Sequence, residues 1–193
     1  MAPKSLSDLF VDELKDLYSA EHQILKALPR MIKAATHPEL KRAFTDHLAQ
    51  TNVHVERLVE ICVDLGASPK GKKCNGMEGI LKEGAALIAE KPEPDVLDAG
   101  LAAAAQHVEH YEMAGYGTVR TWALQLGHAK QAALLQQTLD EEQKADLLLT
   151  MLAESGLNVD AEIEAGLADV APNAKRPLAK SPTVGTREQA DMR

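Results

Sequence analysis

The stretch Leu101–Val119, LAAAAQHVEHYEMAGYGTV, decides the fold of this chain. Apolar residues recur along it every three to four positions, which is typical of one face of an α-helix. Glu112 falls within this apolar row, where the core of a helical protein is expected. Carboxylates are almost never fully buried unless they are paired or bound to a cation. The stretch therefore predicts a long helix that carries a functional group into the protein interior.

The composition of the whole chain also favours helices. Its 193 residues are 45% hydrophobic but only 3% aromatic, and Ala, Leu, Glu, Lys and Gln are abundant. Alanine and unbranched side chains lose little conformational freedom in a helix, so the predicted fold class is all-α. The length suits one domain that buries its own core. We expect this bundle to span residues 1–171 and a flexible C-terminal tail to span 172–193, where helical periodicity is lost.

Helix boundaries follow from proline, glycine and the apolar spacing. Pro38 suits a first helical turn, and Gly66, Gly127 and Gly156 are natural stops. Pro29 is expected to kink the first helix or to split off its last turn. The expected helices span residues 6–32, 38–65, 77–90, 95–126, 128–155 and 160–170.

The order of these helices predicts the topology. The first and second long helices join by a short turn, as do the third and fourth, whereas a long segment with a short helix separates the two hairpins. One long crossover is the connectivity of a ferritin-like four-helix bundle, although any two helical hairpins joined by a decorated linker would give the same pattern.

Further acidic residues interrupt the apolar rows of the other helices. Glu21 falls in the row of the first helix, and Glu142 and Asp146 fall in the row of the fourth. Several carboxylates in one core would repel each other strongly unless protons, cationic side chains or metal ions compensate them. Lysine and arginine are scarce on these faces, so metal ions are the simplest explanation. Partly exposed carboxylates on a wrongly phased helix are the alternative.

The second long helix offers ligands of another kind. Gln50 and His54 are four residues apart and share one helical face, with His47 one turn before Gln50. His54 is a candidate ligand, or an interior histidine with polar partners. The sequence leaves open whether Gln50 or His54 faces the site, because a phase error of one residue exchanges them. Carboxylates with imidazole suit iron or manganese.

Four segments together resemble one known family, the YciE/YciF-like ferritin-like proteins of bacteria. The resemblance covers roughly residues 5–156, in the order of the family. It is carried by Tyr18–Gln23 (YSAEHQ), Cys74–Gly79 (CNGMEG), Val108–Glu112 with Tyr116–Thr118, and Glu141–Asp146 (EEQKAD).

The resemblance implies a ferritin-like bundle, a homodimer, a dinuclear metal site and an association with stress responses. It places acidic metal ligands at Glu21, Glu109, Glu112, Glu142 and Asp146. The chain departs from the family on the second helix, where some relatives have Glu at the position of Gln50 and Gln at that of His54. The predicted metal set is therefore Glu21, His54, Glu109, Glu112, Glu142 and Asp146.

These observations predict a stress-associated protein that binds two divalent ions, iron or manganese, and reacts with oxygen or peroxide. Tyr18 or Tyr111 would then supply a proton or an electron. A non-enzymatic dimeric helical protein, which binds metal or a partner, is the alternative. The net charge of −8 argues against a nucleic-acid partner. No run of about 18 apolar residues predicts a membrane span, and the absence of a signal-peptide pattern predicts a cytoplasmic protein.

Overall fold

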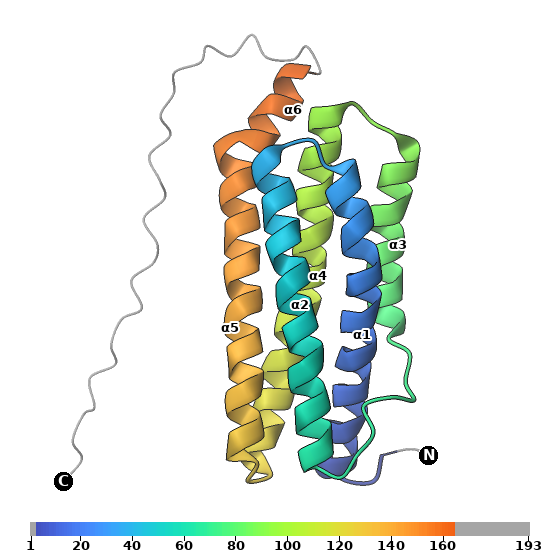
Figure 1. Ribbon diagram of the computed structural model, residues 1–193, viewed down its shortest axis with the longest axis vertical. Helices are drawn as coiled ribbons and strands as arrows, with labels where there is room; N and C mark the ends of the chain where they lie inside the picture. The colour runs from blue at the N-terminus through green and yellow to red at the C-terminus, as the bar shows by residue number, and fades with distance from the viewer. Residues whose placement is uncertain (1–2, 165–193) are drawn as a thin grey trace, which may run out of the picture.

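The computed structural model describes residues 3–164, which contain helices and no strand (Figure 1). The predicted all-α class is confirmed. The helices are α1 (Leu6–Ala34), α2 (Pro38–Asp64), α3 (Asn75–Glu90), α4 (Pro94–Gln125), α5 (Ala129–Leu152), a π-helical turn (Ala153–Leu157) and α6 (Asn158–Glu164).

Four of the helices form the bundle. Each of α1, α2, α5 and α4 packs against the next, and α4 closes the ring against α1. The chain runs up α1 and α5 and down α2 and α4 (Figure 1). Because α2 and α4 point the same way, the chain must return between them, and α3 makes that return along the outside of α1 and α4. This connectivity confirms the ferritin-like four-helix bundle with a crossover that contains a short helix.

Most helix boundaries lie within a few residues of the predicted ones. The Ser5 hydroxyl accepts a hydrogen bond from the Asp8 amide at 3.1 Å and caps α1, and Pro38 opens α2. The turns after α2 and α4 use Gly66 and Gly127 in the left-handed region, at φ values of 65° and 82°. Glycine has no Cβ to penalise that conformation.

Two helix ends differ from the alternatives that the sequence offered. Pro29 does not split off the last turn of α1, which is continuous to Ala34, because the proline is exposed and the single hydrogen bond it removes does not prevent that turn. Gly156 does not stop the fourth long helix, since it lies inside the π-helical turn that leads into α6. Leu157 is 2% exposed in the core, and its burial favours the continuation of the chain. The predicted tail and residues 165–170 lie outside the described residues.

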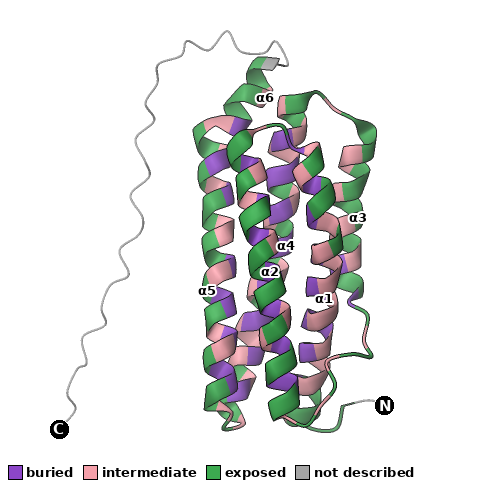
Figure 2. Ribbon diagram, in the orientation of Figure 1, coloured by how far each residue is buried: buried purple, intermediate pink, exposed green. Residues whose placement is uncertain are grey.

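The apolar core consists of two clusters, stacked along the bundle axis, and a polar layer separates them. Along α1, Leu17 belongs to one cluster and Ile24 to the other; along α4, Tyr116 and Val108 are divided in the same way. The helices therefore bury their inward faces (Figure 2), and buried polar side chains such as Glu21 and Glu112 lie between the two clusters. Of the acidic residues predicted as ligands, Glu21, Glu109, Glu112 and Glu142 are buried in this middle layer. No described helix is long and apolar enough to cross a membrane.

Asp98 joins the turn between α1 and α2 to α4. Its carboxylate is 1% exposed and accepts hydrogen bonds from the Thr36 amide at 2.8 Å, the Thr36 hydroxyl at 2.6 Å and the His37 amide at 2.7 Å. These bonds satisfy amides at the start of α2, where the helix itself supplies no acceptor. A charged acceptor at that end also opposes the helix dipole favourably.

The Asp98→Ala substitution is expected to lower the free energy of unfolding by about 1–3 kcal/mol, because three donors lose their acceptor. Asp98→Asn keeps one side-chain oxygen and should cost less. Urea denaturation of both variants, followed by circular dichroism, measures the difference. Equal stability of Asp98→Ala and the parent protein would contradict a stabilising role for this carboxylate.

Candidate metal centre

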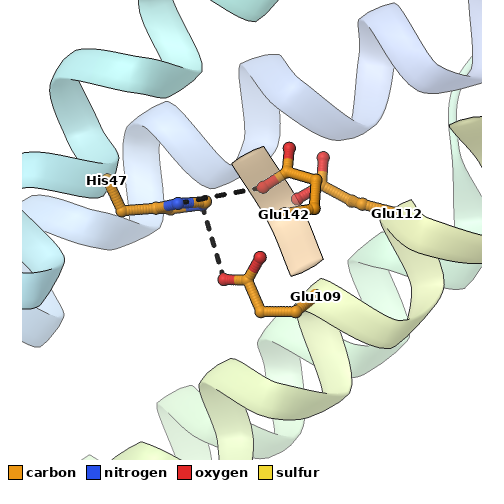
Figure 3. A group of neighbouring side chains, drawn as sticks. All are labelled: His47, Glu109, Glu112 and Glu142. Carbon is orange, nitrogen blue, oxygen red and sulfur yellow. Dashed lines mark ion pairs between the residues drawn. The ribbon is translucent and has the colours of Figure 1, made fainter. Parts of the chain in front are cut away.

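All four bundle helices contribute side chains to the polar layer. Their ligand atoms fall into two groups, and within each group all the atoms lie within 4.8 Å of one another. Glu142 on α5 belongs to both groups. The first group joins it to His47 on α2 with Glu109 and Glu112 on α4 (Figure 3), and the second joins it to Glu21 on α1 with His54 on α2.

Helical spacing explains how each helix presents its side chains. His47 and His54 are two turns apart on one face of α2, and Glu109 and Glu112 are one turn apart on α4. The side chains converge from these helices (Figure 3). His47 Nε2 lies 3.5 Å from Glu109 Oε1, and His47 Nδ1 lies 3.9 Å from Glu142 Oε2. His47 therefore faces two carboxylates of the first group without a hydrogen bond to either of them.

The second group is tighter. His54 Nδ1 lies 2.9 Å from Glu142 Oε1 and 3.4 Å from Glu21 Oε1, and all three side chains are fully buried. The Tyr116 hydroxyl donates a hydrogen bond to Glu21 Oε1 from within the core. Glu21 is thus held from one side by a phenol and faces an imidazole on the other.

Many polar atoms of the two groups lack a hydrogen-bond partner among the described residues. Both carboxylate oxygens of Glu112 and of Glu142 are unsatisfied, as are both ring nitrogens of His47. Buried polar groups in native proteins are normally hydrogen-bonded, and an unsatisfied one costs about 1–3 kcal/mol or more. Such a concentration of unpaired acceptors is what a site for cations requires.

Burial and mutual repulsion change the proton affinities of these groups. Burial, reinforced by neighbouring carboxylates, raises the pKa values of Glu109 and Glu112 well above their usual range. Burial also raises the pKa of Glu21 and lowers that of His47. For His54, burial alone would lower the pKa, but close contact with the carboxylates of Glu142 and Glu21 outweighs it and raises the value to about 10. In the metal-free protein, these raised pKa values favour bound protons on the buried glutamates and on His54, at the positions where metal ions would otherwise balance the charge.

A further set of side chains orients His54. Its Nε2 lies 2.9 Å from Glu141 Oε2, and the Arg57 guanidinium donates two hydrogen bonds to the same carboxylate, of 2.5 and 3.0 Å. The hydrogen bond from Arg57 lowers the pKa of Glu141 and keeps it an acceptor. With a proton on Nε2 donated to Glu141, loss of the second ring proton to a metal ion would leave the lone pair of Nδ1 pointing toward Glu142 and Glu21. Carboxylates behind metal-binding histidines commonly fix the tautomer in this way.

Five of the six predicted ligands lie in the two groups: Glu21, His54, Glu109, Glu112 and Glu142. Asp146 does not. Its carboxylate is 21% exposed and lies 3.2 Å from both His110 Nε2 and Gln106 Nε2. On α2, His54 faces the site and Gln50 is exposed. Asp146 as a ligand therefore stays a prediction to which this arrangement gives no support.

Four residues around the site were not predicted from the sequence. His47 was placed on the same helical face as Gln50 but was not included in the predicted metal set, although its two-turn separation from His54 is visible in the sequence. Arg57, Glu141 and Tyr116 contact the ligands and had no assigned role. The tyrosines considered earlier are elsewhere: Tyr18 packs on His22, and the Tyr111 hydroxyl contacts Asp16 and Cys74.

Glutamate and imidazole side chains from four helices suit hard and borderline divalent ions such as iron and manganese. Two groups that share one carboxylate also match the arrangement of dinuclear centres in helical bundles. The fold and the buried cluster thus define the class of ferritin-like helical proteins with a candidate metal centre in the bundle core. The chain belongs to the family described as "Domain of unknown function (DUF892)", which matches residues 5–162.

Known proteins support this assignment. The chain is 42% identical over 166 residues to protein YciF of Escherichia coli (strain K12), a match that covers 86% of this chain and 100% of that protein. The crystal structure of the E. coli stress protein YciF matches with a TM-score of 0.78 at 41% identity and covers 81% of this chain and 99% of that one. The expected membership of the YciE/YciF-like family is confirmed.

Two further solved structures share the fold. The YcfI protein of Rhodopseudomonas palustris is 41% identical with a TM-score of 0.74, and the match covers 76% of this chain and 94% of that one. A protein of Xanthomonas campestris pv. campestris is 21% identical with a TM-score of 0.68, over 84% of this chain and 99% of that one. The second likeness shows a shared fold alone.

Proposed function

We propose that this protein binds two divalent metal ions, iron or manganese, in the bundle core and uses them in reactions with oxygen or peroxide during stress. The observation that carries the proposal is the set of buried, unsatisfied oxygen and nitrogen atoms on Glu112, Glu142 and His47. Cations would satisfy these atoms, and neighbouring ions would neutralise carboxylates that otherwise repel each other.

The two groups define the residues that would hold the ions. One ion would bind His47, Glu109, Glu112 and Glu142, and the other would bind Glu21, His54 and Glu142. Bound iron or manganese would supply electron transfer to oxygen or peroxide. Glu141 and Arg57 fix the imidazole of His54, and the apolar clusters above and below exclude water. Burial and the neighbouring carboxylates raise the pKa of Tyr116, so its hydroxyl keeps its proton and would hold Glu21 in place through the hydrogen bond that it donates.

The role in stress and the homodimer are also part of this proposal. One relative at 41% identity is described as a stress protein, which supports the first. Exposed apolar side chains on the outer faces of α2 and α5, including Val63, Leu147 and Met151, would give a second copy an apolar surface to cover. A cytoplasmic location stays a prediction.

Peroxide consumption tests the chemistry. Full-length protein loaded with iron(II) or manganese(II) is expected to disproportionate hydrogen peroxide through repeated turnovers, in which one peroxide is oxidised to oxygen while another is reduced to water. An oxygen electrode records the oxygen that is released. The Glu142→Ala variant should lose the activity, whereas Asp140→Ala, an exposed change on the same helix, should keep it. Metal binding without turnover for either ion would contradict the enzymatic part and favour a non-enzymatic metal-binding dimer.

A further inference from the structure

An apolar cavity of about 190 Å³ lies beside the candidate metal centre, between α1, α2, α4 and α5. His47 and Glu109, both members of the first ligand group, form part of its wall. The rim includes Asp46, Gln50 and Lys144, which are exposed, so the cavity opens to the surface. The cavity therefore connects the protein surface with the candidate metal centre.

Apart from Glu141, the rest of the wall is hydrocarbon. It is built by side chains of the core cluster that contains Ile24 and by alanines of α1, α2, α4 and α5, among them Leu28, Met31, Phe44, Val108 and Ala105. Such a wall offers no donors or acceptors, so a polar molecule would lose its hydrogen bonds to water without replacement. An apolar molecule loses little and gains contact with every side of the cavity.

Size and charge narrow the ligand further. An engineered cavity of about 150 Å³ with a hydrocarbon lining binds benzene, so a space slightly larger holds about one substituted ring. Asp46, Glu109 and Glu141 contribute acidic groups to the wall, against the single cation of Lys144. This balance disfavours anions such as short fatty acids, and the apolar interior disfavours a hydrated cation.

We propose that this cavity binds an uncharged, apolar organic molecule about the size of one aromatic ring and holds it against His47 and Glu109. The bound molecule would then be a substrate of the metal centre, and only this part of the inference rests on the proposed function. The binding site itself is defined by the cavity alone. Oxygen, which is small and apolar, could use the same route.

Toluene is the probe, and nuclear magnetic resonance of the full-length protein is the measurement. In metal-free protein with ¹³C-labelled isoleucine methyl groups, toluene is expected to shift the Ile24 signal with a Kd of about 1 mM or tighter. Ile24 lines this cavity but not the neighbouring one of about 380 Å³. An Ile24 signal that stays in place at saturating toluene would overturn the proposal.

Cavity-filling variants locate the bound probe. Ala43→Leu on α2 places a larger side chain into the cavity and should weaken toluene binding at least about tenfold through steric overlap. Ala145→Leu on α5 is an independent variant of the same kind, should the first fail to fold. Ala103→Leu, exposed on α4, is the matched control and should bind toluene like the parent. Loss of binding in Ala85→Leu alone would place toluene in the neighbouring cavity and refute the proposal.

Manganese separates this inference from the proposed function. Protein loaded with manganese(II) is expected to broaden the resonances of bound toluene, because the paramagnetic ion and the cavity share His47 and Glu109. Metal uptake with no toluene binding would overturn the cavity site and leave the metal centre intact. Toluene binding in a protein that takes up no metal would support the cavity site and refute the metal centre.

Discussion

Replacing Glu142 with alanine is expected to remove both metal ions from the protein. Glu142 is the residue that the two ligand groups have in common, and neither of its oxygens has a hydrogen-bond partner among the described residues. Loss of a partner that only orients a ligand already weakens metal binding about 10- to 100-fold. Loss of a shared ligand should therefore exceed about 100-fold for each ion.

Elemental analysis of protein purified without added metal, combined with titration of the metal-free form, measures this effect. The Glu21→Ala variant provides the comparison, because Glu21 belongs to the second group alone and should cost one ion. Asp140→Ala, an exposed change on α5, should keep both ions. Two ions retained in Glu142→Ala would show that the groups do not share this carboxylate. Loss of both ions in Glu21→Ala would show that the two groups bind metal as one unit.

The fold was predictable because its signals are local. Apolar spacing, Pro38 at a helix start and Gly127 in a tight turn each act within a few residues, and the long second connection followed from where the helices end. The prediction that Gly156 ends the fourth long helix was wrong, because the helical continuation through Gly156 depends on contacts with residues far away in the sequence. Leu157 is buried in a core formed largely by other helices, and no nearby residue announces that burial.

The site was predictable where a charge interrupts an apolar row. Glu21, Glu112 and Glu142 were found in this way, because burial of a carboxylate is costly enough to demand a reason. Glu109 was a candidate ligand or a candidate partner of a ligand because it lies three residues before Glu112, and the family resemblance also placed it among the ligands. The pair on α2 was misjudged, since Gln50 and His54 at four-residue spacing drew attention from His47 and His54 at seven-residue spacing. Both spacings satisfy the helical period, and only the rotation of α2 in the bundle decides between them.

The surrounding residues could not be derived from spacing. Arg57 on α2 meets Glu141 on α5, and Tyr116 on α4 meets Glu21 on α1, so each pair depends on how two helices pack. Asp146 shows the converse. It is four residues after Glu142 and shares its helical side, yet its short side chain lies partly exposed near His110 rather than in the centre.

The Glu112→Leu substitution is expected to stabilise the metal-free protein by about 1–3 kcal/mol, although it removes a proposed metal ligand. Glu112 is fully buried and both its oxygens are unsatisfied, so its removal leaves no partner stranded. A leucine in its place adds apolar contact between the two core clusters. For a chain of this size the gain corresponds to roughly 2–4 °C in Tm per kcal/mol.

Glu21→Leu is the matched control, since Glu21 is equally buried but accepts a hydrogen bond from Tyr116 and faces His54. Its removal leaves the Tyr116 hydroxyl without an acceptor and takes one of two carboxylates away from His54 Nδ1, so it should destabilise the metal-free protein by about 1–3 kcal/mol. Without metal, Glu112→Leu is expected to raise the Tm above that of the parent protein and Glu21→Leu to lower it. With metal, both variants are expected to have a lower Tm than the metal-loaded parent, because each lacks a ligand. Thermal unfolding with and without manganese measures both signs.

The pH dependence of the same comparison follows from the raised pKa of Glu112, which burial and then the neighbouring carboxylates cause. A carboxyl whose pKa is higher in the folded protein contributes stability below its unfolded pKa and loses it as the pH rises. The stabilisation by Glu112→Leu should therefore grow between about pH 5 and pH 8 in the metal-free protein. A Tm difference that shrinks over this range, or that is negative at both ends, would contradict the view that Glu112 is held in the core for a cation.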